Sequence, residues 1–383
     1  MDGLSFKKLY HPNRDVDHAA CLRLLLKYKA DTQMRSPSGK IPIFKAIKSS
    51  VMNLQLVLEY DTDRVRTINT VNKKGLSPLC KLAAQPSNEE NFQKINLLLK
   101  AGASCSLTAP KYHPLQMALE AKNLRAVRAI VQESDALESL GKHGKKFDPF
   151  LIGLARAGDA TIFEECLTSW VKMIKLNRPD DSKYLDINLK SADGTNLLHA
   201  IASSHSLPML QALINNTSQL NEYTDYSLDD VQAQMNEPIS AKEPYKTPLY
   251  YSFPNGELAD FMIEYGADVH QLSFLTCYFT YRKPLAPPDR EPFYKFIYNL
   301  AVKHKLDVNE CDILGRNCIA IVYQDLRDDP ASVEIPAPKI NYYELHFLAT
   351  IGSNLNHRCM DNPNMGRSML LDAAYKGRVD LFG

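Results

Sequence analysis

Cysteine and histidine side chains lie close together in the sequence at two places, and these residue types serve in nucleophilic catalysis and in zinc binding. Cys105 precedes His113, and His304 precedes Cys311 and Cys318. A thiol nucleophile also needs an oxyanion hole, whereas a zinc site needs four converging ligands. The sequence contains no CxxC pair, HExxH, GxSxG or phosphate-binding glycine loop. We therefore predict no catalytic residue, no metal site and no cofactor; enzymatic activity stays an open question, and the sequence favours its absence.

Tyrosines gather in two stretches that are candidates for binding a protein. Tyr250 and Tyr251 open one expected helix, and Tyr278 and Tyr281 lie on the corresponding helix of the next expected unit. Tyrosine is enriched at protein interfaces because it combines a large apolar ring with a polar hydroxyl. An equally open alternative is that half of these rings fill an irregular core. The residues that we predict to bind a partner are Tyr250, Tyr251, Tyr278, Tyr281, Lys111 and Tyr112.

The charge distribution does not favour nucleic acids or membranes as partners. The chain has a net charge of +1, with 23% charged and 45% hydrophobic residues, so no overall field attracts an anionic polymer. One basic run, Lys142–Lys146, stands alone at an expected loop tip, where a solvated surface is the simpler interpretation. No stretch is apolar for the roughly 18 residues that a membrane span needs, and no signal-peptide core is present. We expect an intracellular monomer whose eight scattered cysteines are reduced.

The elements that must position these residues follow a repeated pattern. In Gly75–Ala84, a turn glycine is followed by Ser77 and by Pro78 at a helix start, and a short apolar helix comes next. Ile95–Ala103 adds a second, leucine-rich helix that ends at Gly102. One helix–turn–helix unit is complete over this stretch.

The same unit recurs along most of the chain. The successive starts at Gly39, Gly75, Lys111 and Lys146 are separated by 36, 36 and 35 residues. Later starts are spaced more widely and lie at Gly194, Tyr245, Gly315 and Gly366. A recurrence of this kind is typical of solenoids, in which each unit packs only against its neighbours.

The units resemble the ankyrin repeat family, whose period is about 33 residues. The openings Ser77-Pro78-Leu79 and Thr247-Pro248-Leu249 and the closing turn Tyr265-Gly266-Ala267-Asp268-Val269 carry this resemblance. It implies an all-α ankyrin-repeat solenoid of helix–turn–helix repeats with hairpin tips, irregular and with insertions in its C-terminal half. It also implies that His199, in Asn196-Leu197-Leu198-His199-Ala200, hydrogen-bonds backbone between neighbouring repeats and is not a catalytic base.

The resemblance also gives a domain organisation. We expect residues 1–18 to form an N-terminal lead-in and residues 19–383 to form one ankyrin repeat domain. The repeats are regular over about 19–175 and irregular, with insertions, over about 176–383. The first helix should cap the solenoid with a polar outward face, and the insertion at 216–243 should be a connector or a contact loop. The last repeat stops within its second helix, which predicts that the chain is cut from a longer protein.

For function, the resemblance implies a protein–protein interaction module that docks onto a partner protein through its concave surface. The degenerate repeats and the insertions resemble in style the ankyrin effectors that intracellular bacterial pathogens deliver by type IV secretion. Such a protein would act on a host protein in the host cytoplasm or nucleus. The alternative from another class is an ankyrin scaffold with a cysteine-dependent hydrolase pocket, or with an activity located beyond the C-terminus of this chain.

Overall fold

The computed structural model describes residues 18–37, 39–106, 112–133, 136–137, 139, 149–177, 187–222, 226–243, 246–270, 287–311, 315–322 and 340–355. Within these residues all regular secondary structure is helical and no β-strand is present, which confirms the predicted all-α class. None of the helices in this part of the chain has the length and apolarity that crossing a membrane requires. The chain divides into two compact units: unit 1 is 1–147 with 165–185, and unit 2 is 148–164 with 186–383.

Unit 1 is built from short helices. In chain order they are α1 (His18–Lys27), α2 (Ile43–Ala46), α3 (Val51–Tyr60), α4 (Arg64–Asn69), α5 (Pro78–Ala83), α6 (Glu89–Lys100), α7 (Pro114–Glu120) and α8 (Leu124–Val131). The leucine-rich helix expected in Ile95–Ala103 is the second half of α6, which ends at Lys100, so its prediction is confirmed. The sequence did not predict α4.

Capping residues explain where the helices of unit 1 begin. Ser77 accepts a hydrogen bond from the N–H of Cys80 at 3.2 Å, and Pro78 supplies the fixed φ that opens α5. His113 opens α7 in a similar way, since its Nδ1 accepts from the N–H of Leu115 at 3.2 Å. These contacts satisfy backbone N–H groups that the first turn of a helix leaves without intrahelical partners.

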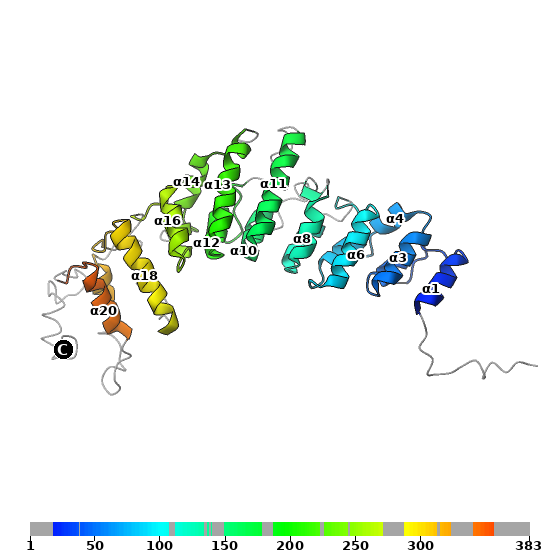
Figure 1. Cartoon of the computed structure of the whole chain (residues 1–383), viewed down its shortest axis with the longest axis horizontal. Coiled ribbons are helices and arrows are strands. Elements are labelled where there is room, and N and C mark those ends of the chain that lie inside the picture. Colours follow the sequence, from blue (N-terminus) through cyan, green and yellow to red (C-terminus); the bar gives the residue numbers. More distant parts are fainter. Residues whose placement is uncertain are drawn as a thin grey trace, which may run out of the picture. The chain divides into compact units, whose positions relative to one another are not determined.

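The helices of unit 1 form two packed layers. In one layer, α1, α3, α6 and α8 contact one another in chain order (Figure 1). In the other layer α5 contacts α7, and each of these also packs against the helix that follows it. The core between the layers is apolar, with Leu54, Leu79, Ile95, Leu98 and Leu115 almost fully buried. Burial of these leucine and isoleucine side chains is the main force that holds the layers together.

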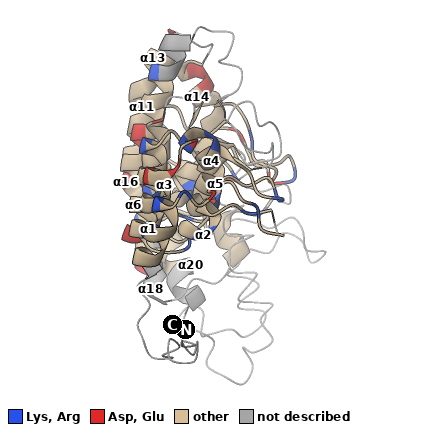
Figure 2. Ribbon diagram, turned by 90° about the vertical axis from the view of Figure 1, so that its right-hand side faces the viewer, with Lys and Arg blue, Asp and Glu red and all other residues tan. Residues whose placement is uncertain are grey.

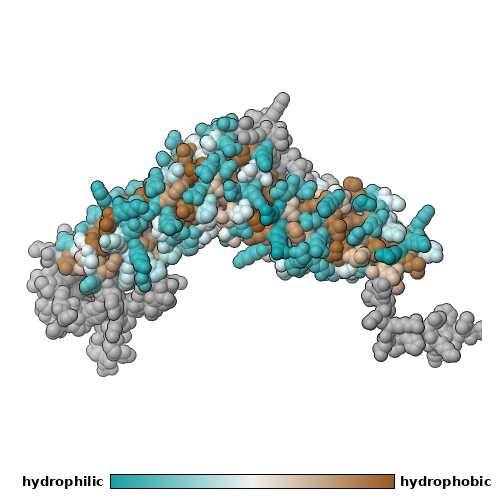
Figure 3. All heavy atoms as spheres, viewed as in Figure 1, coloured by the Kyte–Doolittle hydropathy of each residue, from teal (hydrophilic) through white to brown (hydrophobic). Residues whose placement is uncertain are grey.

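The outward surface of α1 differs from the prediction. We expected a polar face, but Leu24, Leu25 and the following Tyr28 are 57%, 60% and 78% exposed. Leu26 is buried where α1 packs against α3. Figure 3 shows brown apolar residues among teal polar ones over these first helices. The prediction of a polar cap was therefore wrong for this helix. Its consecutive leucines extend around more of the helix than the one face that packs against α3.

Unit 2 contains longer and less regular helices. They are α10 (Phe150–Ala157), α12 (Leu197–Ser203), α13 (Leu207–Asn221), α14 (Leu228–Met235), α15 (Pro248–Tyr251), α16 (Gly256–Glu264), α18 (Pro287–Lys303) and α20 (Ile340–Thr350). α10, α12 and α15 contact in succession, as do α13, α16 and α18. α11 (Ala160–Asn177) begins in unit 2 and ends in unit 1, and Trp170 on it is buried.

The insertion predicted at 216–243 is not a simple connector. α13 continues into it, and α14 follows as a separate helix. Ser227 and Asp230 form a capping box at the start of α14, while Val231 and Met235 are fully buried. α14 packs against α12, α13 and α15. The expectation of a loop was wrong because Val231 and Met235, four residues apart, lie on the same face of a helix. The core can bury that face although the rest of the segment is polar.

Glycines in the left-handed region recur at the turns before α2, α5 and α12. Gly39, Gly75 and Gly194 have φ angles of 73°, 79° and 84°, which glycine adopts without the steric penalty of a Cβ atom. The N–H of each donates to the carbonyl three residues earlier. At Gly194 the turn is also crowded, because an added Cβ would lie 2.2 Å from the carbonyl oxygen of Ile239.

Asparagine side chains join turns that are far apart in the sequence. In three places the amide nitrogen donates to a glycine carbonyl, and the amide oxygen accepts from the N–H two residues beyond that glycine. The distances are 2.6–3.3 Å, and the sets are Asn69 with Gly102 and Ser104, Asn236 with Gly266 and Asp268, and Asn309 with Gly352 and Asn354. Each asparagine satisfies both backbone groups of its partner turn at once. We call these three arrangements the asparagine clamps.

Several predicted features lie outside the described residues. They are residues 1–17 of the lead-in, the basic run 142–146, the expected helix at 272–281 and the incomplete last repeat after residue 355. The organisation into one repeat domain over 19–383 stays a prediction.

Candidate functional site

Tyr250 and Tyr251 lie at the end of α15, a short helix that begins at Pro248 after Thr247. Both side chains are half-buried. Their rings meet edge to face, with centroids 5.3 Å apart and an angle of 79° between the planes. This geometry is favourable for two aromatic rings, because the positive edge of one faces the negative face of the other. We call these two residues the tyrosine pair.

The ring of His199 on α12 packs against that of Tyr251 in the tyrosine pair. Its ring centroid lies 5.8 Å from that of Tyr251, again edge to face. Its Nε2 lies 3.0 Å from the carbonyl oxygen of Lys246, and Nδ1 takes part in the capping box with Asn196. A carbonyl only accepts, so Nε2 carries the proton and donates. The predicted hydrogen bond from His199 to backbone is confirmed.

Burial sets the protonation state of both residues in this contact. It lowers the pKa of His199 to about 4, against the opposing effect of the Lys246 carbonyl. It also raises the pKa of Tyr251 to about 12, with Tyr250 and Glu243 adding to the effect. At neutral pH the imidazole is therefore uncharged and the phenol keeps its proton. The tyrosine pair can offer apolar ring surface and neutral hydroxyl groups, but it cannot supply a charged nucleophile.

The other predicted partner-binding residues are placed differently. Tyr112 is half-buried just before α7 in unit 1, and its carbonyl accepts from the thiol of Cys80 at 3.7 Å. Lys111, Tyr278 and Tyr281 lie outside the described residues. The structure therefore brings Tyr250 together with Tyr251, while a common surface for all six residues stays a prediction.

A groove that the sequence did not predict lies between α16 and α18 in unit 2. Its volume is about 660 Å³. Apolar and acidic side chains share its wall, and the lining residues are Pro254, Gly256, Glu257, Asp260, Glu291, Pro292, Lys295, Phe296 and Asn299. The ring of Phe253 packs edge to face on that of the buried Phe296, with centroids 5.5 Å apart, so an aromatic contact lies beside this groove.

Asp260 in this groove ties α16 to α18. Its Oδ1 accepts from Asn299 Nδ2 at 2.7 Å and lies 2.6 Å from His304 Nε2, while Lys303 pairs with Oδ2. Partial burial acts to raise the pKa of Asp260, but the hydrogen bonds from Lys303, His304 and Asn299 hold it below its ordinary value. An aspartate and a histidine in contact are two members of a catalytic triad, yet Lys303 and Asn299 occupy the same carboxylate, which is the pattern of a structural ion cluster.

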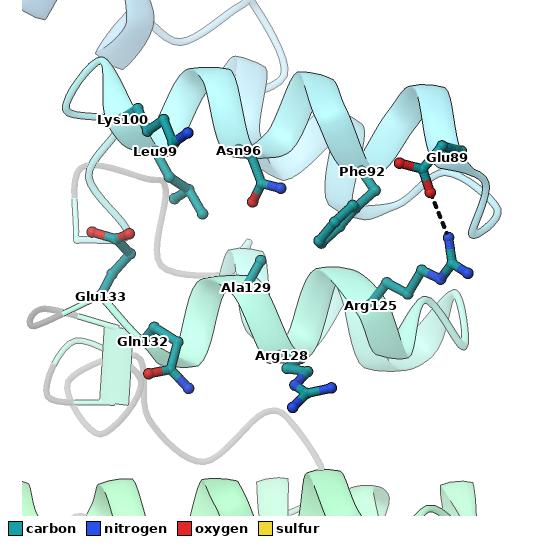
Figure 4. Close-up of a pocket in the computed structure, with 10 residues that line it drawn as sticks. All are labelled: Glu89, Phe92, Asn96, Leu99, Lys100, Arg125, Arg128, Ala129, Gln132 and Glu133. Atoms are coloured by element: carbon teal, nitrogen blue, oxygen red, sulfur yellow. Dashed lines mark hydrogen bonds and ion pairs between the residues drawn. The ribbon is translucent and has the colours of Figure 1, made fainter.

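A second groove lies between α6 and α8 in unit 1 (Figure 4). Its volume is about 860 Å³. Phe92 and Leu99 on α6 face Ala129 on α8, whose small side chain leaves space between the helices. At one end Arg125 pairs with Glu89 at 2.9 Å. Such a groove, with an apolar floor and a charged rim, could accept an apolar side chain of a partner.

Three buried cysteines, Cys80, Cys166 and Cys318, are poor nucleophiles. Burial raises the pKa of Cys80 and of Cys318 to about 11 and that of Cys166 to about 12, so the thiolate needed for nucleophilic attack is scarce at neutral pH. Cys80 and Cys318 are both fully buried. Among the described residues, no three His, Cys, Asp or Glu side chains gather where they could hold a metal ion. Of the other candidate residues, Cys105 and His113 are buried, His304 contacts Asp260, and Cys311 is half-buried.

Comparison with known proteins finds no family model and no curated protein that matches this chain. Its function must therefore be argued from the geometry of the surfaces described above.

Proposed function

We propose that the chain is an ankyrin-type repeat solenoid that binds a partner protein. Three features support the repeat architecture: left-handed glycines at the turns, asparagine clamps that join one turn to another, and helices that pack in two layers in chain order. The asparagine clamps carry the argument, because they place the same two hydrogen bonds at equivalent positions in both units. A repeated contact between adjacent turns is what a stack of similar units requires.

The tyrosine pair is the proposed contact surface for the partner. Tyr250 and Tyr251 are half-buried, so much of their ordering entropy is already lost before binding, and a partner gains ring surface at low additional cost. They lie on an inner helix, and the inner helices of a solenoid line its concave face. Tyr112, which immediately precedes the inner helix α7 of unit 1, is the second proposed contact.

The proposed partner is a protein of a host cell. This part of the proposal rests on the resemblance in style to secreted ankyrin effectors, and it places the chain's action in the host cytoplasm or nucleus. The same docking surface would serve any protein partner, so the binding experiment is designed to be independent of the source of the partner.

The test compares the native chain with Tyr250→Ala and with Tyr298→Ala in cross-linking pull-downs from eukaryotic lysate, read by mass spectrometry. Tyr298 is an exposed tyrosine on α18 and serves as a matched control. We expect Tyr250→Ala to weaken capture of a specific protein about tenfold, the typical loss for an interface tyrosine, while Tyr298→Ala captures it normally. Helical circular dichroism and the melting temperature should stay unchanged. Equal capture by all three chains would reject the tyrosine pair as the contact surface.

A further inference from the structure

Four lysines form a positively charged surface on unit 1, which we call the lysine patch. Lys45 and Lys48 are exposed on and just after α2, Lys40 precedes that helix, and Lys81 lies on α5. The ammonium group of Lys81 lies 5.8 Å from the ring centroid of Phe44, so the side chain from α5 reaches back over α2. Figure 2 shows Lys and Arg positions in blue on and beside α4 and α5 in this unit.

In the part of the chain that the structure describes, no acidic side chain pairs with a lysine of the patch. Residues 35–58 and 64–88 contain no aspartate or glutamate, although both stretches contain several basic residues. None of the four lysines forms an ion pair with another described residue, whereas lysines elsewhere in the chain, such as Lys94 and Lys246, do. Burial lowers the pKa of Lys81, and repulsion from Lys48, Lys40 and Lys45 lowers it further, so the other three charges of the patch act on Lys81. Uncompensated repulsion of this kind weakens a fold rather than stabilising it.

We propose that the lysine patch binds an acidic segment of a partner protein. Negatively charged side chains of the partner would neutralise the lysines of the patch. This charge complementarity would speed association and fix the orientation of the partner. The spacing fits an elongated ligand, because Lys45 and Lys81 are separated by 36 residues, the same interval that separates Gly39 from Gly75. The two lysines therefore occupy equivalent positions on neighbouring helix pairs.

The surroundings of the patch favour an acidic protein segment over other anionic ligands. Single-stranded nucleic acid is held by aromatic rings on which the bases stack, and the aromatic ring in this cluster, Phe44, is fully buried. An anionic membrane surface is bound most firmly by a helix that inserts apolar side chains, and none of the exposed large apolar residues lies on α2 or α5. This inference goes beyond the tyrosine pair, because it concerns a separate surface and names the chemistry that it recognises.

The test measures binding of a fluorescein-labelled polyglutamate peptide by fluorescence anisotropy in low salt, about 50 mM, where such charges are weakly screened. The variant Lys45→Gln, Lys48→Gln, Lys81→Gln removes three charges from the patch. Its matched control, Lys27→Gln, Lys172→Gln, Lys242→Gln, removes three exposed charges elsewhere. We expect the patch variant to bind at least about tenfold more weakly, the control to bind as the native chain does, and raised salt to abolish the difference.

Two further measurements distinguish lost binding from lost folding and the lysine patch from the tyrosine pair. Because the substitutions relieve repulsion, the melting temperature of the patch variant should equal or exceed that of the native chain, which shows that lost binding is not lost folding. Tyr250→Ala should bind the peptide normally, so failure of the tyrosine pair and failure of the lysine patch are distinguishable. The proposal is overturned if the native chain does not bind the peptide, if both triple variants lose affinity equally, or if oligothymidylate or anionic vesicles bind the patch in preference to the peptide.

Discussion

Acidification should destabilise the protein through His199, whose neutral ring is buried between α12 and the tyrosine pair. The folded pKa is about 4, against the ordinary value of 6.5 in an unfolded chain. Between these two values the unfolded chain binds more protons than the folded chain, so stability present above about pH 6.5 is lost as the pH falls towards 4. The pKa difference corresponds to about 3 kcal/mol, a large part of the stability of an ordinary domain.

The control for this prediction is His199→Gln, which does not titrate and whose amide N–H can still donate to the Lys246 carbonyl. Apparent free energies of unfolding would be measured with urea and far-UV circular dichroism at several pH values between 7 and 4. We expect the native chain to be the more stable at pH 7 and to lose about 3 kcal/mol of that advantage by pH 4. Other histidines titrate in both proteins and cancel in the comparison. Parallel pH profiles would refute the argument, because they would show that His199 is protonated as easily in the folded state as in the unfolded one.

Two further predictions concern backbone geometry and thiol reactivity. Gly194→Ala places a Cβ atom 2.2 Å from a carbonyl oxygen and should cost more than about 3 kcal/mol, whereas Gly158→Ala, at φ 81° with open space around it, should cost about 1 kcal/mol; equal losses in melting temperature would contradict this. The exposed Cys21 should react with a thiol reagent in the folded protein, whereas Cys166, whose pKa burial raises to about 12, should react only after unfolding; mass spectrometry of the labelled native chain would reveal any exception.

Local sequence signals predicted the helices whose ends depend on local chemistry. Ser77 and Pro78 identify the start of α5, and the leucine-rich run from Ile95 lies in α6. Both signals could be recognised because a capping bond and an apolar stripe each depend on residues close together in the sequence. The structural role of His199 was also accessible, since its neighbours carry a recognisable motif. These predictions needed no knowledge of what each element packs against.

Features that depend on distant contacts could not be predicted in this way. α14 lies in a polar insertion, and its helix is stabilised by burial of Val231 and Met235 against three other helices. The Asp260 cluster combines residues from two helices that pair only after folding. The asparagine clamps left a weak signal, a recurring asparagine roughly one unit before each closing glycine, but an isolated asparagine is equally typical of any turn.

The lysine patch shows why whole-chain charge was a poor guide to partners. A net charge of +1 argued against nucleic acids and membranes as partners, and that inference concerns long-range attraction, which depends on the summed charge. At contact distance only charges within about one Debye length matter, roughly 10 Å at moderate salt. The charges that act on Lys81 are those of Lys48, Lys40 and Lys45, and residues 35–58 and 64–88 contain no aspartate or glutamate. An almost neutral chain can therefore present a strongly basic surface. The sequence signal that would have located this surface is the pair of stretches without acidic residues, not the net charge of the whole chain.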